Sequence, residues 1–127
     1  MRYLLDTHIV LWIFNEPRKL PPTTRNILEN PANNLTVGIL SAWEIAIKLS
    51  IGKVKFPGGV SAFIQTIQRS GLELLTIMPS HVEMVEKLPF IHRDPFDRLL
   101  VATALCEKMT IITADENIHQ YAIPWTC

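Results

Sequence analysis

Residues 2–14 read RYLLDTHIVLWIF, a short apolar run, one aspartate and then a longer apolar run. The first run, Arg2–Leu5, has the length and composition of a buried strand. We expect His8–Phe14 to form a helix, because Asp6 or Thr7 supplies the kind of side chain that caps a helix start. A buried strand that leads directly into a helix is the repeating unit of an α/β fold.

The same alternation continues along the chain. Further strands are predicted at Asn34–Val37, Leu72–Ile77, Thr110–Thr113 and, at an edge, Ile123–Trp125. Helices are predicted at Pro22–Asn30, Ser41–Gly52, Val60–Ser70, Ser80–Leu88, Asp94–Lys108 and, as a short turn, Asp115–Gln120, with loops at Asn15–Pro22 and Lys53–Gly59. Because helices separate the strands, the sequence predicts the α/β class: a single three-layer α/β/α domain over residues 1–127, with a mainly parallel central sheet.

Composition narrows the class of protein. A chain of 127 residues suits one domain that buries roughly two-thirds of the surface of its unfolded form. Its 12 basic and 12 acidic residues balance, so any contact with nucleic acid must be local. Cys106 and Cys127 form neither a disulfide framework nor a zinc site, and no signal peptide or membrane span is apparent. We expect a soluble, cytoplasmic protein with no membrane partner.

Four acidic residues stand where strands end or helices begin: Asp6, Glu44, Asp97 and Asp115. In an open parallel sheet, ligands bind outside the carboxyl ends of the strands. Hard divalent cations need clustered oxygen ligands, which carboxylates supply. The pattern therefore predicts these four acids as catalytic residues and as ligands of Mg²⁺ or Mn²⁺ at a site for metal-assisted phosphodiester chemistry.

Three of these acids also have a structural interpretation. Asp6 could merely cap the first helix, and Asp115 could cap the short helix that follows it, with Thr113 supplying a hydroxyl. Glu44 lies four residues before Lys48, a spacing typical of a weak ion pair on a helix surface. However, the apolar residues around Glu44 indicate a largely buried helix, where an isolated carboxylate would be costly without a cation.

The segment Asp94-Pro95-Phe96-Asp97 contains two acids that need separate interpretations. Asp94 is placed to cap the helix and Pro95 to fill its first position. Asp97 falls in the first turn, where the helix dipole favours a negative charge but where a side chain is also directed into a cleft. We assign Asp94 to capping and Asp97 to the metal.

Four blocks of sequence resemble those of the PIN-domain family, and especially its bacterial VapC-type toxins. They are LLDTH at 4–8, SAWEIAIK at 41–48, DPFDRLLVATA at 94–104 and TAD at 113–115. The resemblance covers almost the whole chain, with the blocks in the family's order and spacing. It implies a compact α/β/α nuclease that cuts single-stranded RNA with clustered acids and Mg²⁺ or Mn²⁺, usually held inactive by a cognate antitoxin. By that resemblance Asp6, Glu44 and Asp97 match the family's three most regular acids, and Asp115 its more variable fourth.

Basic residues near the acids are candidates for binding substrate phosphates. Lys48, Arg93 and Arg98 are the candidates, because cations at the mouth of an acidic pocket would bind the phosphates that flank the scissile one. Lys53 and Lys55 are explained equally well as ordinary solvated charges. The histidines show no spacing typical of a zinc site.

The sequence thus favours a metal-dependent endoribonuclease, acting as the toxin of a toxin–antitoxin pair. Its expected partners are an RNA substrate, a cognate antitoxin and a second copy of itself, the last because apolar helices near Trp12 and Phe14 are expected to be exposed. Two alternatives remain open. One is a metal-dependent DNA nuclease or phosphatase that uses the same acids; the other is a catalytically idle binding module, in which the acids only cap helices.

Overall fold

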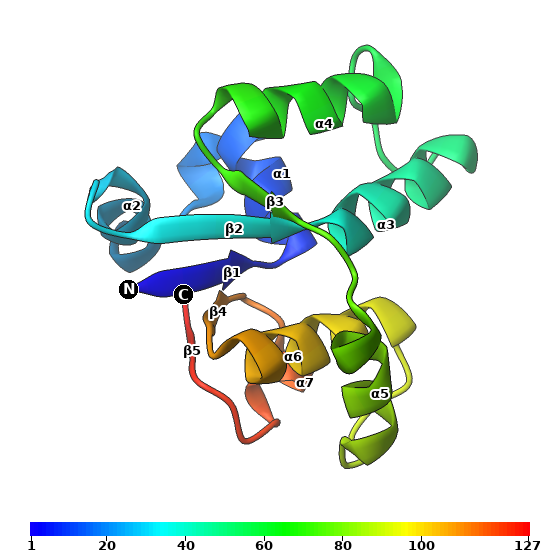
Figure 1. The fold of residues 1–127 in the computed structure, drawn as a ribbon. Coiled ribbons are helices and arrows are strands. Elements are labelled where there is room, and N and C mark those ends of the chain that lie inside the picture. The colour runs from blue at the N-terminus through cyan, green and yellow to red at the C-terminus, as the bar shows by residue number, and fades with distance from the viewer.

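A computed structural model describes residues 1–127, and its centre is a five-stranded sheet (Figure 1). The strands are β1 (Arg2–Leu5), β2 (Asn34–Gly38), β3 (Glu73–Leu75), β4 (Thr110–Ile112) and β5 (Trp125–Thr126). They lie in the order β3-β2-β1-β4-β5, and every neighbouring pair is parallel. The predicted α/β class with a mainly parallel central sheet is confirmed.

Helices cover both faces of this sheet. They are α1 (Thr7–Asn15), α2 (Pro22–Glu29), α3 (Ile39–Ser50), α4 (Gly59–Arg69), α5 (Pro79–Lys87), α6 (Pro95–Glu107) and α7 (Glu116–His119), with a 3₁₀ turn η1 (Pro17–Lys19). In Figure 1, α1 and α4 lie on one side of the sheet, and α5, α6 and α7 lie on the other. None of the helices is long and apolar enough to cross a bilayer.

The alternating side chains of the central strands build two separate cores. Leu5 of β1 and Ile112 of β4 point into the core beneath α1, α3 and α4. Their neighbours Leu4 and Ile111 point into the opposite core, against α6 and α7. All four are fully buried, which explains why these strands read as continuous apolar runs in the sequence.

Some element boundaries differ from the predicted ones. The helix predicted from Ser41 begins at Ile39, directly after β2, because Ser41 is buried within it beside Thr7 rather than free to cap its start. The edge strand lies at Trp125–Thr126 rather than Ile123–Trp125, since Pro124 has no N–H to donate to a ladder. The expectation of exposure near Trp12 is wrong: Trp12 and Phe14 are partly buried against the first core.

Candidate active site

The four predicted acids lie at one edge of the sheet. Asp6 directly follows β1, and its amide donates to the carbonyl of Ile112 at the end of β4 (3.0 Å). Asp115 follows β4, while Glu44 and Asp97 come from α3 and α6. Their charges act on one another: Asp6, Asp115 and Glu44 all raise the pKa of Asp97. The fold therefore brings together the acids that the sequence proposed for one site.

Asp6 is a buried carboxylate held by a hydroxyl. It is 4% exposed, and its side chain makes no capping hydrogen bond to α1, so the capping alternative is not realised. Thr113 donates its hydroxyl hydrogen to Asp6 Oδ2 over 2.8 Å. Burial raises the pKa of Asp6, and the Thr113 hydrogen bond offsets only part of that effect.

Glu44 has both of its oxygens engaged. It is 9% exposed; Thr7 Oγ1 lies 2.8 Å from Oε1, and Lys48 Nζ lies 2.8 Å from Oε2. Because a carboxylate can only accept, the Thr7 hydroxyl donates to it. The ion pair expected at this spacing is therefore present, and it is formed at the acidic cluster rather than on an outer surface. Lys48 supplies a positive charge beside Glu44, and its side chain remains partly exposed.

Asp94 and Asp97 divide their roles as predicted for the helix start. Asp94 Oδ1 accepts from the amides of Phe96 (2.9 Å) and Asp97 (3.0 Å), which confirms Asp94 as the cap of α6. Asp97 takes no part in capping, and its Oδ2 lies 3.1 Å from His92 Nε2. Burial raises the pKa of Asp97 to about 8, and the neighbouring charge of Asp94 contributes next.

Asp115 combines two features. Its Oδ1 accepts from the amide of Asn117 (2.8 Å) and caps α7, as the structural interpretation expected. Its own amide donates to Thr113 Oγ1 (3.0 Å), so one hydroxyl links Asp115 to Asp6. Its Oδ2 accepts no hydrogen bond from the chain, which leaves that oxygen for a ligand.

The donor set suits a hard divalent cation. Asp97 Oδ1 and Asp115 Oδ2 accept no hydrogen bond from the chain, and Asp6 Oδ1 meets at most the amide of its neighbour Thr7. Oxygens of this kind are the ligands of Mg²⁺ and Mn²⁺. The spacing is open, since no three acids or histidines are arranged closely enough around one point to hold an ion. The carboxylate oxygens are therefore chemically suitable ligands. In this structure the acids lie near one another but do not form a closed coordination shell.

Comparison with known proteins identifies the family of this chain. The model of the PIN domain matches residues 3–124. The chain belongs to the PIN-domain family. It is also similar to Ribonuclease VapC22 of Mycobacterium tuberculosis (strain ATCC 25618 / H37Rv), with 27% identity over 122 residues that make up 95% of this chain and 92% of that protein.

Solved structures share the fold of this PIN domain. One is VapBC2 from Rickettsia felis bound to a DNA fragment from its promoter, with a TM-score of 0.73, 17% identity and coverage of 99% of this chain and 98% of that one. Another is VapBC-1 from nontypeable Haemophilus influenzae, with a TM-score of 0.70, 20% identity and coverage of 99% and 97%. At these identities the similarity shows the three-layer fold.

A basic cleft adjoins the acids of the PIN domain. A hollow of about 220 Å³ is lined in part by Asp6, Asp115, His8 and Trp12. The same His8 and Trp12 also line a larger cleft of about 720 Å³, whose lysines are Lys19, Lys48, Lys53 and Lys55. Lys53 and Lys55, which the sequence explained equally well as phosphate contacts or as ordinary solvated charges, thus line the cleft that shares His8 and Trp12 with the hollow at the acids.

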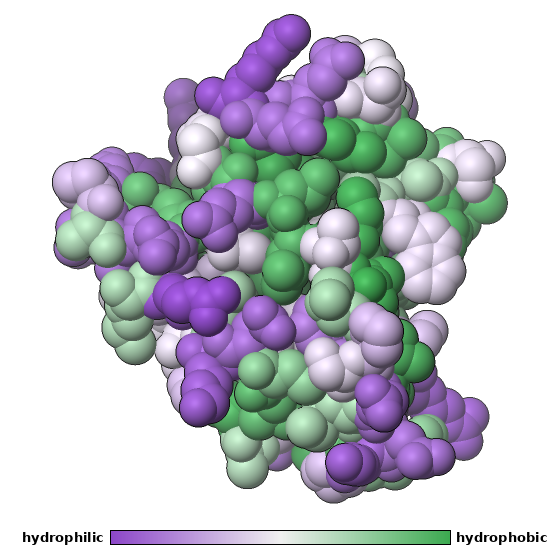
Figure 2. All heavy atoms as spheres, in the orientation of Figure 1, coloured by the Kyte–Doolittle hydropathy of each residue, from purple (hydrophilic) through white to green (hydrophobic).

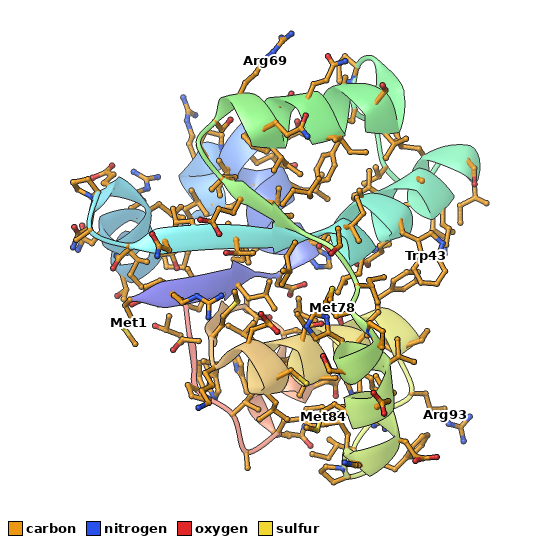
Figure 3. The ribbon with its side chains drawn as sticks, in the orientation of Figure 1. Met1, Trp43, Arg69, Met78, Met84 and Arg93 are labelled. Carbon is orange, nitrogen blue, oxygen red and sulfur yellow. The ribbon has the colours of Figure 1, made fainter.

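Neither of the two arginines predicted to contact phosphates lines the hollow or the cleft. Arg98 is 8% exposed, and its guanidinium donates to the carbonyls of Pro89 (3.0 Å) and Val85 (3.3 Å) and to the hydroxyl of Tyr121 (3.1 Å). The expectation that Arg98 contacts substrate is therefore corrected, because its donors are committed inside the protein. Arg93 is exposed and extends into solvent from the loop before α6 (Figure 3).

Sequence reasoning missed several neighbours of the acids. Thr7 was weighed only as a helix cap, yet its hydroxyl fixes Glu44. Trp43 was expected within a largely buried helix but is 55% exposed, and its ring meets Phe96 edge-on with centroids 4.8 Å apart (Figure 3). This contact braces α3 against α6 and so fixes the spacing of the acids that follow each aromatic. Thr7, directly after Asp6, and Trp43 and Phe96, directly before Glu44 and Asp97, were the available signal.

Substitution of the α6 cap should affect stability but not the acids. Asp94→Asn should keep the cap, because Asn accepts the same amide hydrogen bonds. Asp94→Ala removes both bonds and should lower the free energy of unfolding by about 0.5–2 kcal/mol. Urea unfolding of the two variants beside the wild type measures this difference. Equal stability of Asp94→Ala and wild type would contradict the capping role.

The raised pKa of Asp97 should make the metal-free protein less stable at higher pH. A carboxyl whose pKa is 3.8 when unfolded and about 8 when folded favours the folded state most below pH 3.8, and this contribution is lost as the pH rises through about 8. In EDTA, we expect the melting temperature of Asp97→Asn, relative to that of the wild type, to increase as the pH rises from about 4 to about 8. If the difference in melting temperature between the two proteins stayed constant across that pH range, the pKa of Asp97 would not be raised in the folded state.

Proposed function

We propose that this PIN domain is a divalent-metal-dependent endoribonuclease that cuts single-stranded RNA and acts as the toxin of a cytoplasmic toxin–antitoxin pair. One observation carries the proposal: aspartates with free oxygens cluster at the carboxyl ends of β1 and β4, beside a lysine-lined cleft. The similarity to Ribonuclease VapC22 supports the choice of RNA.

The three aspartates Asp6, Asp97 and Asp115 would hold the cation, together with Glu44. Bound there, Mg²⁺ or Mn²⁺ supplies polarisation of the phosphoryl oxygen and a lowered pKa for the attacking water. No side-chain nucleophile is needed. Thr113 holds Asp6, and Thr7 holds Glu44, so that the carboxylates do not reorient when substrate arrives.

The lysines of the cleft would bind the phosphates on either side of the scissile one. Lys48 links the two features, because its ammonium contacts Glu44 while its side chain lines the cleft. A phosphate that approaches Lys48 would loosen its ion pair and free Glu44 Oε2. Arg93 is exposed near the start of α6 and remains a candidate contact for a longer RNA.

The alternative functions make different use of the same features. A cleft of about 720 Å³ with four lysines suits a polymer better than a phosphate monoester, which argues against a phosphatase. A binding module in which the acids only cap helices would not need Asp6, which is buried, or Asp97, which is partly buried, since neither side chain caps a helix. A DNA nuclease would use the same residues, and only the substrate test separates it from a ribonuclease.

Purified protein should cut a labelled single-stranded RNA in Mg²⁺ or Mn²⁺, lose this activity in EDTA and regain it when the ion is added back. Single-stranded DNA, duplex RNA and a phosphate monoester serve as comparison substrates. Cleavage should leave a 5′-phosphate and a 3′-hydroxyl, because water attacks the phosphorus in line with the P–O3′ bond, which breaks, and O3′ leaves and takes up a proton. Cleavage that persists in EDTA would contradict the metal mechanism, and preferential cleavage of DNA would assign the other nuclease class.

Two protein partners belong to this proposal. The two solved structures compared above are VapBC assemblies, which supports a cognate antitoxin for this chain. An antitoxin arginine placed among the acids would occupy the charge position of the cation. A homodimer is supported by the exposed apolar residues Trp43 and Ile47 of α3 and Ile51 directly after it. Apolar surface is visible on the α3 side of the molecule in Figure 2.

A further inference from the structure

A line of hydrogen bonds runs from the interior of the protein to Asp97. Arg98 Nη1 lies 3.1 Å from Tyr121 Oη, Tyr121 Oη lies 2.9 Å from His92 Nδ1, and His92 Nε2 lies 3.1 Å from Asp97 Oδ2. Tyr121 is 4% exposed and the His92 side chain 12% exposed, so the line is largely shielded from water. It joins three segments: the loop before α6, the first turns of α6 and the segment after α7.

The chemistry of these groups gives the line a direction. A guanidinium can only donate, so Tyr121 Oη accepts from Arg98 and has its own hydrogen left to give. In the neutral tautomer with the ring proton on Nε2, Tyr121 donates that hydrogen to His92 Nδ1. His92 Nε2–H then donates to Asp97 Oδ2, and every group in the line has a partner of the opposite kind.

The inner end of the line is firmly held. Arg98 also donates to two main-chain carbonyls, those of Pro89 and Val85, and its guanidinium stacks over the ring of Phe90 with 4.9 Å to the centroid. The His92 and Tyr121 rings pack edge to face, with centroids 5.5 Å apart. The imidazole therefore has a fixed place and a fixed orientation behind Asp97.

We propose that His92, supported by Tyr121 and Arg98, is a positioning residue that holds Asp97 Oδ2 and so presents Oδ1 to the divalent cation. This inference rests on the proposed function of the same acids. His92 would hold one carboxylate oxygen of Asp97. Thr113 holds one oxygen of Asp6 in the same way, and Thr7 holds one oxygen of Glu44. Without His92, repulsion from the neighbouring acids would turn the Asp97 carboxylate away from the site.

Two substitutions of His92 test its two ring nitrogens separately. His92→Gln carries an amide near the Nε2 position and can still donate to Asp97. His92→Asn reaches only the Nδ1 position, so it can accept from Tyr121 but not hold Asp97. Tyr121→Phe removes the hydroxyl behind His92, and Tyr3→Phe is its control, because Tyr3 is the chain's other tyrosine and its hydroxyl contacts Met1 Sδ.

The first readout is Mn²⁺ binding to the RNA-free protein, measured by calorimetry. The second is the pair kcat and KM for RNA cleavage at saturating Mn²⁺. We expect His92→Asn to lose roughly 10–100-fold in Mn²⁺ affinity or kcat with little change in KM, as is usual when a group behind a metal ligand is removed. His92→Gln should retain most of both, Tyr121→Phe should fall between the two, and Tyr3→Phe should match the wild type.

The outcomes distinguish this inference from the function on which it rests. If His92→Asn melts at a lower temperature yet binds Mn²⁺ and turns over RNA like the wild type, His92 only stabilises the fold and the inference is overturned. If the wild type binds Mn²⁺ but leaves RNA intact, the proposed ribonuclease function is overturned. In that case, weaker Mn²⁺ binding by His92→Asn would still support the positioning role of His92. A wild type that binds no Mn²⁺ would overturn both.

Discussion

Asp97→Asn should nearly abolish RNA cleavage while leaving the protein folded. Asn keeps the size of the side chain but lacks the negative charge that a hard cation requires. The loss should therefore exceed the roughly 10–100-fold that follows removal of a group behind a metal ligand. The metal-free variant should be at least as stable as the wild type near neutral pH, because a partly buried carboxylate with four acidic neighbours has been replaced by a neutral amide. Cleavage rates at fixed Mg²⁺ and melting curves in EDTA test both statements.

Asp94→Asn is the matched control for that experiment. It makes the same chemical change three residues away, on an acid whose contacts are with the amides of α6. This control should cleave RNA at a rate close to that of the wild type. If Asp94→Asn is inactive and Asp97→Asn is active, the roles of the two acids are reversed; if both are active, neither is a metal ligand.

Expression of the wild-type chain alone should arrest bacterial growth, and co-expression of the adjacent small gene should relieve the arrest. Cutting RNA in the cytoplasm explains the arrest, and a partner that inserts a cation among the acids explains the relief. Asp97→Asn expressed to the same level is the control, and it should allow normal growth. Normal growth of cells that contain abundant, folded wild-type protein would favour a housekeeping nuclease or a binding module.

The fold was predictable because it depends on local, repeated features. Apolar strands such as Arg2–Leu5 alternate with helices, and their burial on both faces makes them readable as uninterrupted apolar runs. The start of α6 was also predictable, since Asp94 and Pro95 satisfy a helix N-terminus through contacts only a few residues apart. Predicted helix boundaries were wrong where tertiary contacts determined the role of a residue. Ser41, for example, packs beside Thr7 instead of capping a helix.

The acids of the site were predictable in position, while their surroundings were not. Strand ends and helix starts placed Asp6 and Asp97 at one edge of a parallel sheet. The Arg98 side chain points into the protein because its guanidinium binds Tyr121 and carbonyls from α5 and the loop after it. These contacts are distant in sequence, so no local pattern predicts them. His92 presented no motif, because its partners Tyr121 and Asp97 come from two other segments of the chain.

A single Mn²⁺ titration of metal-free protein tests most directly whether these acids hold the catalytic cation. The melting temperature and the rate of single-stranded RNA cleavage are measured on the same samples. Burial, together with repulsion from the neighbouring acids, raises the pKa of Asp97 to about 8, and a bound ion should relieve the repulsion. We predict that both quantities rise with the same midpoint in the wild type and that neither rises in Asp97→Asn. Cleavage at full rate before any Mn²⁺ is added, with a melting temperature that does not respond to the ion, would contradict the account.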